Sequence, residues 1–411
     1  MSTTHPPSFA ALRIPAYRFL ISAFLLTMMA DNIEHVISYW MMFQQFHSPE
    51  LGGFAVISHW LPYLVFSVPA GALADRFDPR RLIQIGMLMF MFCSLAWGYF
   101  FLTDSLQLWE AMALLVLHGC SGVLWMTSTQ IILYDVVGKS NLPSGIRLLA
   151  TARYLGLLVG PAVGALMMLG LGPKVGIILN ACFYLPNLIW LMNAPCGPKF
   201  RDSPIAPPRA FKGFKDIFIT AQEIAHEHKI TSMILLAGAA SFFIGNSYQA
   251  QMPGFAQDLG HGDPGILYST LLAADAAGAL LAGLLLESRG GILKTSPITA
   301  IGLAVLWCAS LLCFALSEQY LLAILCLFIG GFFELSFNSM AQTIVQLNAP
   351  LEIRGRVIGL FNMSALGMRA GAGITVGLLG GMIGIHWSLA ISATCLIAVS
   401  STLYWRFKHK F

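Results

Sequence analysis

Three ionisable residues interrupt one of the most apolar stretches of the chain. Residues 25–40 read LLTMMADNIEHVISYW and contain Asp31, Glu34 and His35. Spacings of three and four residues place these side chains on one face of a helix. Carboxylates and imidazoles in apolar surroundings can carry protons or bind cations, so this segment is a candidate functional site.

Further polar residues interrupt apolar stretches later in the chain. A charged group inside a membrane costs about 3 kcal/mol or more unless it faces a cavity or a partner, so each of them requires a reason. Glu334 and Asn338 are four residues apart and share one helix face. The full set comprises His59, His118, Arg153, Asp275, Glu334, Asn338 and Arg369.

The sequence allows two interpretations of these charges. In the first, Asp31 or Glu34 carries a coupling proton, with Asp275 and Glu334 as the second choice, because burial favours the protonated form of a carboxylate. In the second, the acids belong to fixed ion pairs. Arg153 would then pair with Asp31 or Glu34, and Arg369 with Asp275 or Glu334.

A metal site is a third interpretation of the same residues. If their helices converge, Asp31, His35, His59 and His118 could supply imidazole and carboxylate ligands suited to divalent metals. No two histidines stand at a spacing typical of metal ligands, however, and the eight cysteines form no CxxC pair. We therefore expect neither a bound metal nor a cofactor.

The composition shows which elements must position these residues. Of the 411 residues, 57% are hydrophobic and 10% are charged, whereas a soluble domain carries roughly a quarter charged residues. The chain is therefore expected to be an all-α integral membrane protein, with helices of about 20 apolar residues crossing the bilayer. Twelve such runs are expected at 17–44, 51–74, 82–102, 107–134, 146–169, 174–194, 230–256, 264–286, 294–316, 319–346, 355–382 and 386–406.

The distribution of basic residues predicts the orientation in the membrane. With twelve spans, both termini lie on one side. If that side is the cytoplasm, every Lys and Arg faces it except Lys174, Arg153 and Arg369, as the positive-inside rule requires. We expect cytoplasmic termini and a location in the inner or plasma membrane.

The longest polar stretch divides the expected spans into six and six. Residues 1–194 would form an N-terminal bundle, 195–229 a cytoplasmic linker, and 230–411 a C-terminal bundle, with a central cavity between the bundles. Within the linker, an apolar stripe at helical spacing predicts a helix on the inner membrane surface, although a simple tether remains equally possible. The stripe consists of Phe211, Phe214, Phe218, Ala221 and Ala225.

The two bundles resemble each other in sequence. AGALADR at 70–76 corresponds to AGLLLESR at 282–289, so that Gly71 and Asp75 align with Gly283 and Glu287. LPSGIR at 142–147 likewise corresponds to APLEIR at 349–354. These correspondences indicate an internal duplication, as in many transporters, whose substrate site lies near the midplane between the repeats.

The segment GALADRFDPRRLIQIG at 71–86 is a candidate gate at the cytoplasmic surface. Asp75 can accept hydrogen bonds from the N-terminus of a neighbouring helix, while Arg76, Arg80 and Arg81 can pair with nearby acids. Such contacts can hold helix ends together in one conformation and release them in another. For Arg80 and Arg81, anchoring on the cytoplasmic side is a further role.

With the twelve spans and the duplication, this segment resembles the signature of the major facilitator superfamily. Gly71, Asp75, Arg76, Arg80 and Arg81 match the signature, and Asp78 stands where glycine is usual. The resemblance implies that spans one, four, seven and ten line a central cavity. RYLGLLVGPAVGAL at 153–166 is similar to a pattern of the superfamily's antiporters, although a packing seam of small residues would look the same. PLEIRGRVIGLFNMSALGMRAGAG at 350–373 resembles the branch of macrolide and catecholate-siderophore exporters.

Together these features predict a monomeric, proton-coupled secondary transporter that works by alternating access. We expect it to export an amphipathic small organic molecule of the drug or siderophore type. An importer, a divalent metal-ion carrier and, less favoured, a non-transporting receptor remain as alternatives. No nucleophile–base pair points to an enzyme, and no feature points to nucleic acid as a partner.

Overall fold

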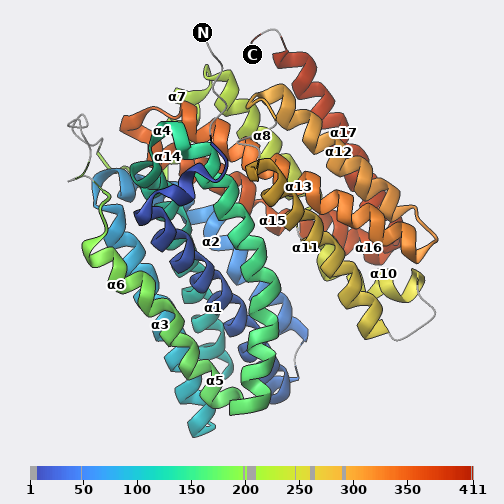
Figure 1. The fold of residues 1–411 in the computed structure, drawn as a ribbon. Helices are drawn as coiled ribbons and strands as arrows, with labels where there is room; N and C mark the ends of the chain where they lie inside the picture. The colour runs from blue at the N-terminus through green and yellow to red at the C-terminus, as the bar shows by residue number, and fades with distance from the viewer. Residues whose placement is uncertain are drawn as a thin grey trace.

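The computed structural model describes residues 7–47, 49–197, 200, 210–245, 247–259, 264–288, 293–408 and 410. Within these residues the elements are helices, and no strand is found. The first long helix begins, and the last ends, at the same end of the molecule (Figure 1). We call this the terminal end.

The helices up to residue 193 form the N-terminal group. Several begin at a proline, whose fixed φ suits the first helical position. Before α3, Asp78 caps the helix by accepting a hydrogen bond from the Arg80 backbone N–H at 3.0 Å. The group comprises α1 (Pro15–Phe46), α2 (Pro49–Arg76), α3 (Pro79–Thr103), α4 (Leu108–Leu171), α5 (Pro173–Asn180) and α6 (Leu185–Asn193).

The helices from residue 228 onward form the C-terminal group, which lies beside the first group in Figure 1. The short helix α7 (Lys215–Ile224) precedes it. The group comprises α8 (His228–Phe243), α9 (Ser247–Ala250), α10 (Met252–Leu259), α11 (Pro264–Ser288), α12 (Pro297–Ala315), α13 (Tyr320–Asn348), α14 (Arg354–Asn362), α15 (Arg369–Ala372), α16 (Leu379–Ile383) and α17 (Ile385–Phe407).

Each group has its own hydrophobic core. One buried cluster draws almost entirely on residues after 224, and two others draw on residues before 197. Two residues cross this division. Val68 of α2 packs into the C-terminal core, and Leu366 packs into an N-terminal one.

Eleven helices among the described residues are long and apolar enough to cross a membrane. One of them, α4, has 64 residues, which at 1.5 Å per residue is about three times the thickness of the hydrocarbon core. Gly138, with φ 68° and ψ 171°, breaks it into two arms. The two arms match the runs expected at 107–134 and 146–169, and the total of twelve spans remains a prediction.

Three of the expected spans are not continuous α-helices. The run at 174–194 contains a 3-10 segment, Ala181–Tyr184, between α5 and α6. The run at 230–256 was expected to be one helix, but α8 ends before Gly245, where φ is 50°, and the chain continues as α9 and α10. Glycine adopts this left-handed conformation without the steric cost that a side chain imposes. The run at 355–382 contains two π-helical segments, Met363–Gly367 and Gly373–Leu378.

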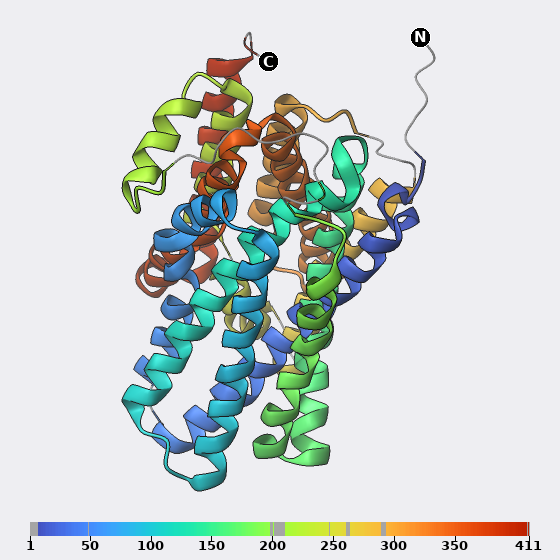
Figure 2. The same cartoon turned by 90° about the vertical axis from the view of Figure 1, so that its left-hand side faces the viewer.

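The linker helix α7 turns its apolar stripe away from the protein. Asp216, Thr220 and Ile224 of α7 are buried, whereas all five residues of the stripe are exposed, Phe218 to 71%. In Figure 2, α7 projects at the terminal end. An exposed aromatic stripe at this place suits a membrane surface, and its position there remains a prediction.

Candidate functional site

A buried imidazole lies between two carboxylates in the N-terminal group. His118 of α4 has Nε2 2.7 Å from Asp31 Oδ1 and Nδ1 2.8 Å from Glu34 Oε1, both on α1. All three residues are buried. Each ring nitrogen thus has an oxygen partner, so the ring orientation is fixed from both sides.

These contacts correct the ion pair expected from the sequence. Arg153 was expected to be the compensating group for Asp31 or Glu34, but no ion pair joins it to either acid in the described structure, and His118 takes that place. Arg153 lies on the second arm of α4 and lines a cavity that Asp31 also lines.

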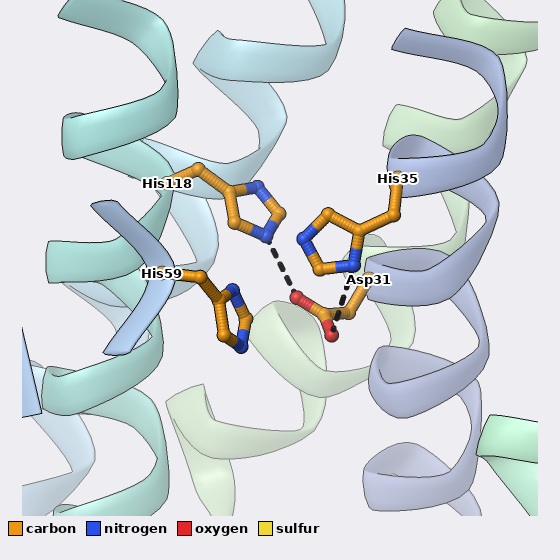
Figure 3. Close-up of side chains that lie close together, drawn as sticks. All are labelled: Asp31, His35, His59 and His118. Carbon is orange, nitrogen blue, oxygen red and sulfur yellow. Dashed lines mark hydrogen bonds and ion pairs between the residues drawn. The ribbon is translucent and has the colours of Figure 1, made fainter. Parts of the chain in front are cut away.

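The carboxylate of Asp31 also belongs to a larger cluster of possible metal-ligand atoms. His35 of α1 and His59 of α2 point toward Asp31 and His118, as Figure 3 shows. Each of the four residues offers a ligand atom, and these atoms all lie within 4.8 Å of one another. Three helices therefore bring together residues that are up to 87 positions apart in sequence.

A second acidic cluster lies in the C-terminal group. The hydroxyl of Tyr248 in α9 lies 3.1 Å from Asp275 Oδ2 of α11 and 3.4 Å from Glu334 Oε2 of α13. Gln249 donates a further hydrogen bond of 2.9 Å to Asp275. The expected pairing of Arg369 with either acid is absent as an ion pair among the described residues. The break that separates α8 from α9 places Tyr248 between the two acids.

Two cavities adjoin each other near the first of these clusters. One, of about 780 Å³, is lined by Asp31, His35 and His59, and the other, of about 770 Å³, by Asn338 and Arg369. Both cavities share the residues Met126, Arg153 and Leu366 as lining.

The two arginines of these cavities form no ion pair with a carboxylate in the part of the chain that the structure describes. The guanidinium of Arg369 lies 4.7 Å from the ring centroid of Trp60, and its Nε and Nη1 have no hydrogen-bond partner in the described structure. Arg153 likewise forms no ion pair with a described residue. Two cations without a carboxylate partner among the described residues, one of them over an aromatic ring, suit an anionic, partly aromatic ligand.

At the terminal end, Asp75 joins the two groups. It accepts hydrogen bonds from the backbone N–H groups of Gly355 at 2.6 Å and Arg356 at 3.1 Å, at the start of α14. The partial positive charge of a helix N-terminus favours a carboxylate there. Gly71 allows this approach, because a Cβ at that position would collide with the Gly355 carbonyl. Asp75 is thus placed as the sequence suggested.

The basic residues of the same segment have different partners from those expected. Arg80 pairs with Asp78 at 2.6 Å, Arg81 donates to the amide of Gln84, and Arg76 lies beside the ring of Phe77. Partial burial acts to raise the pKa of Asp78, but hydrogen bonds from Arg80 outweigh it and hold the pKa below its usual value. Only Arg80 among these arginines pairs with an acid in the part of the chain described.

A second junction at the terminal end mirrors the first. Glu287 of α11 accepts hydrogen bonds from the Ser144 hydroxyl and from Arg147 Nε at 2.8 Å, both at the start of the second arm of α4. Gly283 packs against Thr151 of the same arm. Each group therefore docks a glycine and an acid onto a helix start of the other. The internal repeat, which aligns Glu287 with Asp75, indicated that Glu287 could form such a junction. Nothing in the sequence indicated that Arg356 is buried between Asp75 and Asp216.

Comparisons with known proteins agree with this architecture. A family model of the major facilitator superfamily, described as a transmembrane secretion effector, matches residues 6–410. The enterobactin exporter EntS of Shigella boydii serotype 4 (strain Sb227) is 25% identical over 382 residues, which cover 90% of this chain and 85% of the relative.

Solved structures show the same fold at low sequence identity. FucP, a major facilitator transporter in the outward conformation, superposes with a TM-score of 0.75 at 14% identity, covering 96% of this chain and 99% of that one. The human organic anion transporter MFSD10 superposes with a TM-score of 0.71 at 13% identity, covering 95% of this chain and 100% of that one. The chain belongs to the transmembrane secretion effector family of major facilitator superfamily transporters.

Proposed function

We propose that this protein exports an amphipathic small organic anion, using the proton gradient as its energy source. The observation that carries this proposal is the cavity that holds the guanidinium groups of Arg153 and Arg369, neither of which forms an ion pair with a carboxylate of the described residues. Two like charges in one half-buried space are costly unless an anion joins them.

The aromatic lining narrows the substrate class. Trp60, Tyr63 and Trp125 face the cavity that Asp31 also lines, and Tyr154 faces the adjoining one. Aromatic walls with a few placed charges suit a ligand that has both ring faces and anionic groups. A catecholate or a related siderophore-like compound has this chemistry, and the enterobactin exporter is a relative across nearly the whole chain.

Proton coupling is assigned to the buried acids. Asp275 and Glu334 share one hydroxyl donor and have no cationic partner within ion-pair distance in the described structure. Repulsion between two such carboxylates is relieved when one of them carries a proton. Asp31 and Glu34, the first candidates from sequence, already have His118 between them, so we place the coupling proton on Asp275 and Glu334.

The two junctions at the terminal end support alternating access. We propose that the chain forms two six-span halves, that the terminal end is cytoplasmic because the basic residues lie there, and that the junctions of Asp75 and Glu287 close it. The protein would act as a monomer in the inner or plasma membrane. Breaking both junctions would open the cavity to the cytoplasm.

Transport into proteoliposomes under an imposed pH gradient tests this function. A catecholate siderophore and an aromatic carboxylate should be transported, whereas a lipophilic cation should not. Arg369→Gln and Arg153→Gln should each reduce uptake about tenfold or more, because a charged hydrogen bond contributes about 1.5–3 kcal/mol.

A matched control is Lys174→Gln, which removes an exposed cation paired with Asp104 outside the cavity. It should leave uptake unchanged. Equal transport of anions and cations, or full activity of both arginine variants, would contradict the proposal.

A further inference from the structure

The cluster of Asp31, His35, His59 and His118 has the features of a metal site. We propose that it binds a divalent transition-metal ion with the preferences of zinc or iron(II). This binding goes beyond the proposed export of an organic anion and does not depend on it. The expectation of no metal rested on sequence spacing alone, which could not show that α1, α2 and α4 converge here.

The donor set is sufficient in number and close in space. Three imidazoles and one carboxylate offer ligand atoms that all lie within 4.8 Å of one another. Ligands of a tetrahedral zinc ion, bound at about 2.0–2.2 Å, lie about 3.4 Å apart. The cluster would therefore contract by roughly 1 Å around the ion, which side-chain rotation can supply because the residues come from three separate helices.

An outer layer of hydrogen bonds orients the central ligand. His118 Nδ1 lies 2.8 Å from Glu34 Oε1, so that the opposite nitrogen, Nε2, points at Asp31. Glu34 in turn accepts a hydrogen bond from Ser94, whose hydroxyl accepts one from Asn180. A carboxylate that binds the far nitrogen of a metal-binding histidine is the usual supporting arrangement, and it sets both tautomer and ring direction.

One ligand residue has an unsatisfied ring nitrogen. His59 Nδ1 is buried and has no hydrogen-bond partner in the described structure. Its ring centroid lies 4.9 Å from that of His35 and 6.0 Å from that of His118. A buried imidazole nitrogen without a partner carries a desolvation penalty of about 1–3 kcal/mol, which coordination to a metal would remove.

Charge and access fit a divalent ion from solution. Asp31 and Glu34 bring two negative charges to one place, which an ion of charge +2 would balance. The cavity of about 780 Å³ gives the ion a route to Asp31, His35 and His59. Imidazole with carboxylate favours zinc, iron(II), cobalt or nickel, whereas magnesium and calcium prefer oxygen ligands alone.

Metal binding to the purified full-length protein, without a histidine tag and after treatment with a chelator, tests the inference. Zn²⁺ titrated by calorimetry should bind at one equivalent, and Co²⁺ should develop the visible bands of a low-coordinate site. His59→Ala removes a ligand without removing a hydrogen bond of the described structure, so the variant should fold. It should bind Zn²⁺ at least about tenfold more weakly.

The controls separate this site from incidental binding. His386→Ala removes a histidine of α17 that contacts the Ala315 carbonyl far from the cluster, and it should bind Zn²⁺ as the wild type does. Mg²⁺ should give no heat. The inference would be overturned if folded protein, identified by a cooperative melting transition, showed no saturable Zn²⁺ binding. It would also be overturned if the wild type and His59→Ala bound Zn²⁺ with equal affinity. The measurement needs no substrate and no gradient, so failure of transport and failure of metal binding are told apart.

Discussion

At the scale of single residues, the arrangement of the buried acids separates two roles that the sequence could not. Asp31 and Glu34 are held by an imidazole, whereas Asp275 and Glu334 face each other across one tyrosine hydroxyl. One imidazole can balance at most one of the two negative charges of the first pair. Under the proposed proton coupling, the second pair gains most from a mobile proton.

Asp275→Asn and Glu334→Gln test the second pair directly. Each variant keeps the shape and a hydrogen bond to Tyr248 but removes a site for the proton. Transport driven by a pH gradient should fall to the background rate, while exchange of substrate for substrate should continue. Asp258→Asn, an acid of α10 that is exposed and pairs with His386, is the matched control. Gradient-driven transport at the wild-type rate in both cavity variants would move the coupling proton to Asp31 and Glu34.

The pairing of Arg153 with Asp31 or Glu34, predicted from the sequence, was wrong, and the reason is physical. Local spacing placed Asp31, Glu34 and His35 on one face of a helix, and the structure has them on α1 near one cavity. The identity of their partner depends on how α4 packs against α1, which is a contact across 84 to 87 positions. Formal charge favoured Arg153, but the first arm of α4 brings an imidazole closer.

At the scale of helices, the two junctions of the terminal end can be compared with each other. Asp75 accepts hydrogen bonds from two backbone N–H groups and forms an ion pair with Arg356. Glu287 accepts a hydrogen bond from Ser144 and forms an ion pair with Arg147. Most helix ranges were predictable from apolar runs. The break at Gly245 and the π-helical segments were not, because they depend on single backbone conformations rather than on hydrophobicity.

Asp75→Asn should loosen the first junction. The amide keeps one acceptor oxygen but turns an N–H donor toward Gly355 and Arg356, so charged hydrogen bonds of about 1.5–3 kcal/mol each are lost. A cysteine introduced by Asn338→Cys into a cysteine-free background reports exposure of the cavity. From the terminal side, its modification should be roughly tenfold faster in the Asp75→Asn variant.

Glu287→Gln provides the matched variant at the second junction and should give a smaller but similar increase. The two changes together should exceed either alone, because the junctions close the same end. Unchanged reporter modification in the double variant would show that neither acid holds the gate.

At the scale of the whole molecule, the proposed alternating access would require the two helix groups to separate at the terminal end during each cycle. Beneath the junctions, Gln130 of α4 donates a hydrogen bond of 3.1 Å to Asn362 of α14, and Asn362 donates to Thr127 at 3.2 Å. These bonds join the groups directly and must break when the cavity opens to that side. Gln130→Cys with Asn362→Cys, joined by a short thiol crosslinker in a cysteine-free background, should therefore abolish transport while leaving Zn²⁺ binding at the opposite part of the cavity intact. A crosslink between Lys174→Cys and Asp104→Cys, which pair within the N-terminal group, should have no effect because that pair moves as one body. Full transport by protein with the first crosslink would mean that the groups can stay joined at this point during the cycle. The proposed separation of the two groups at the terminal end would then be wrong.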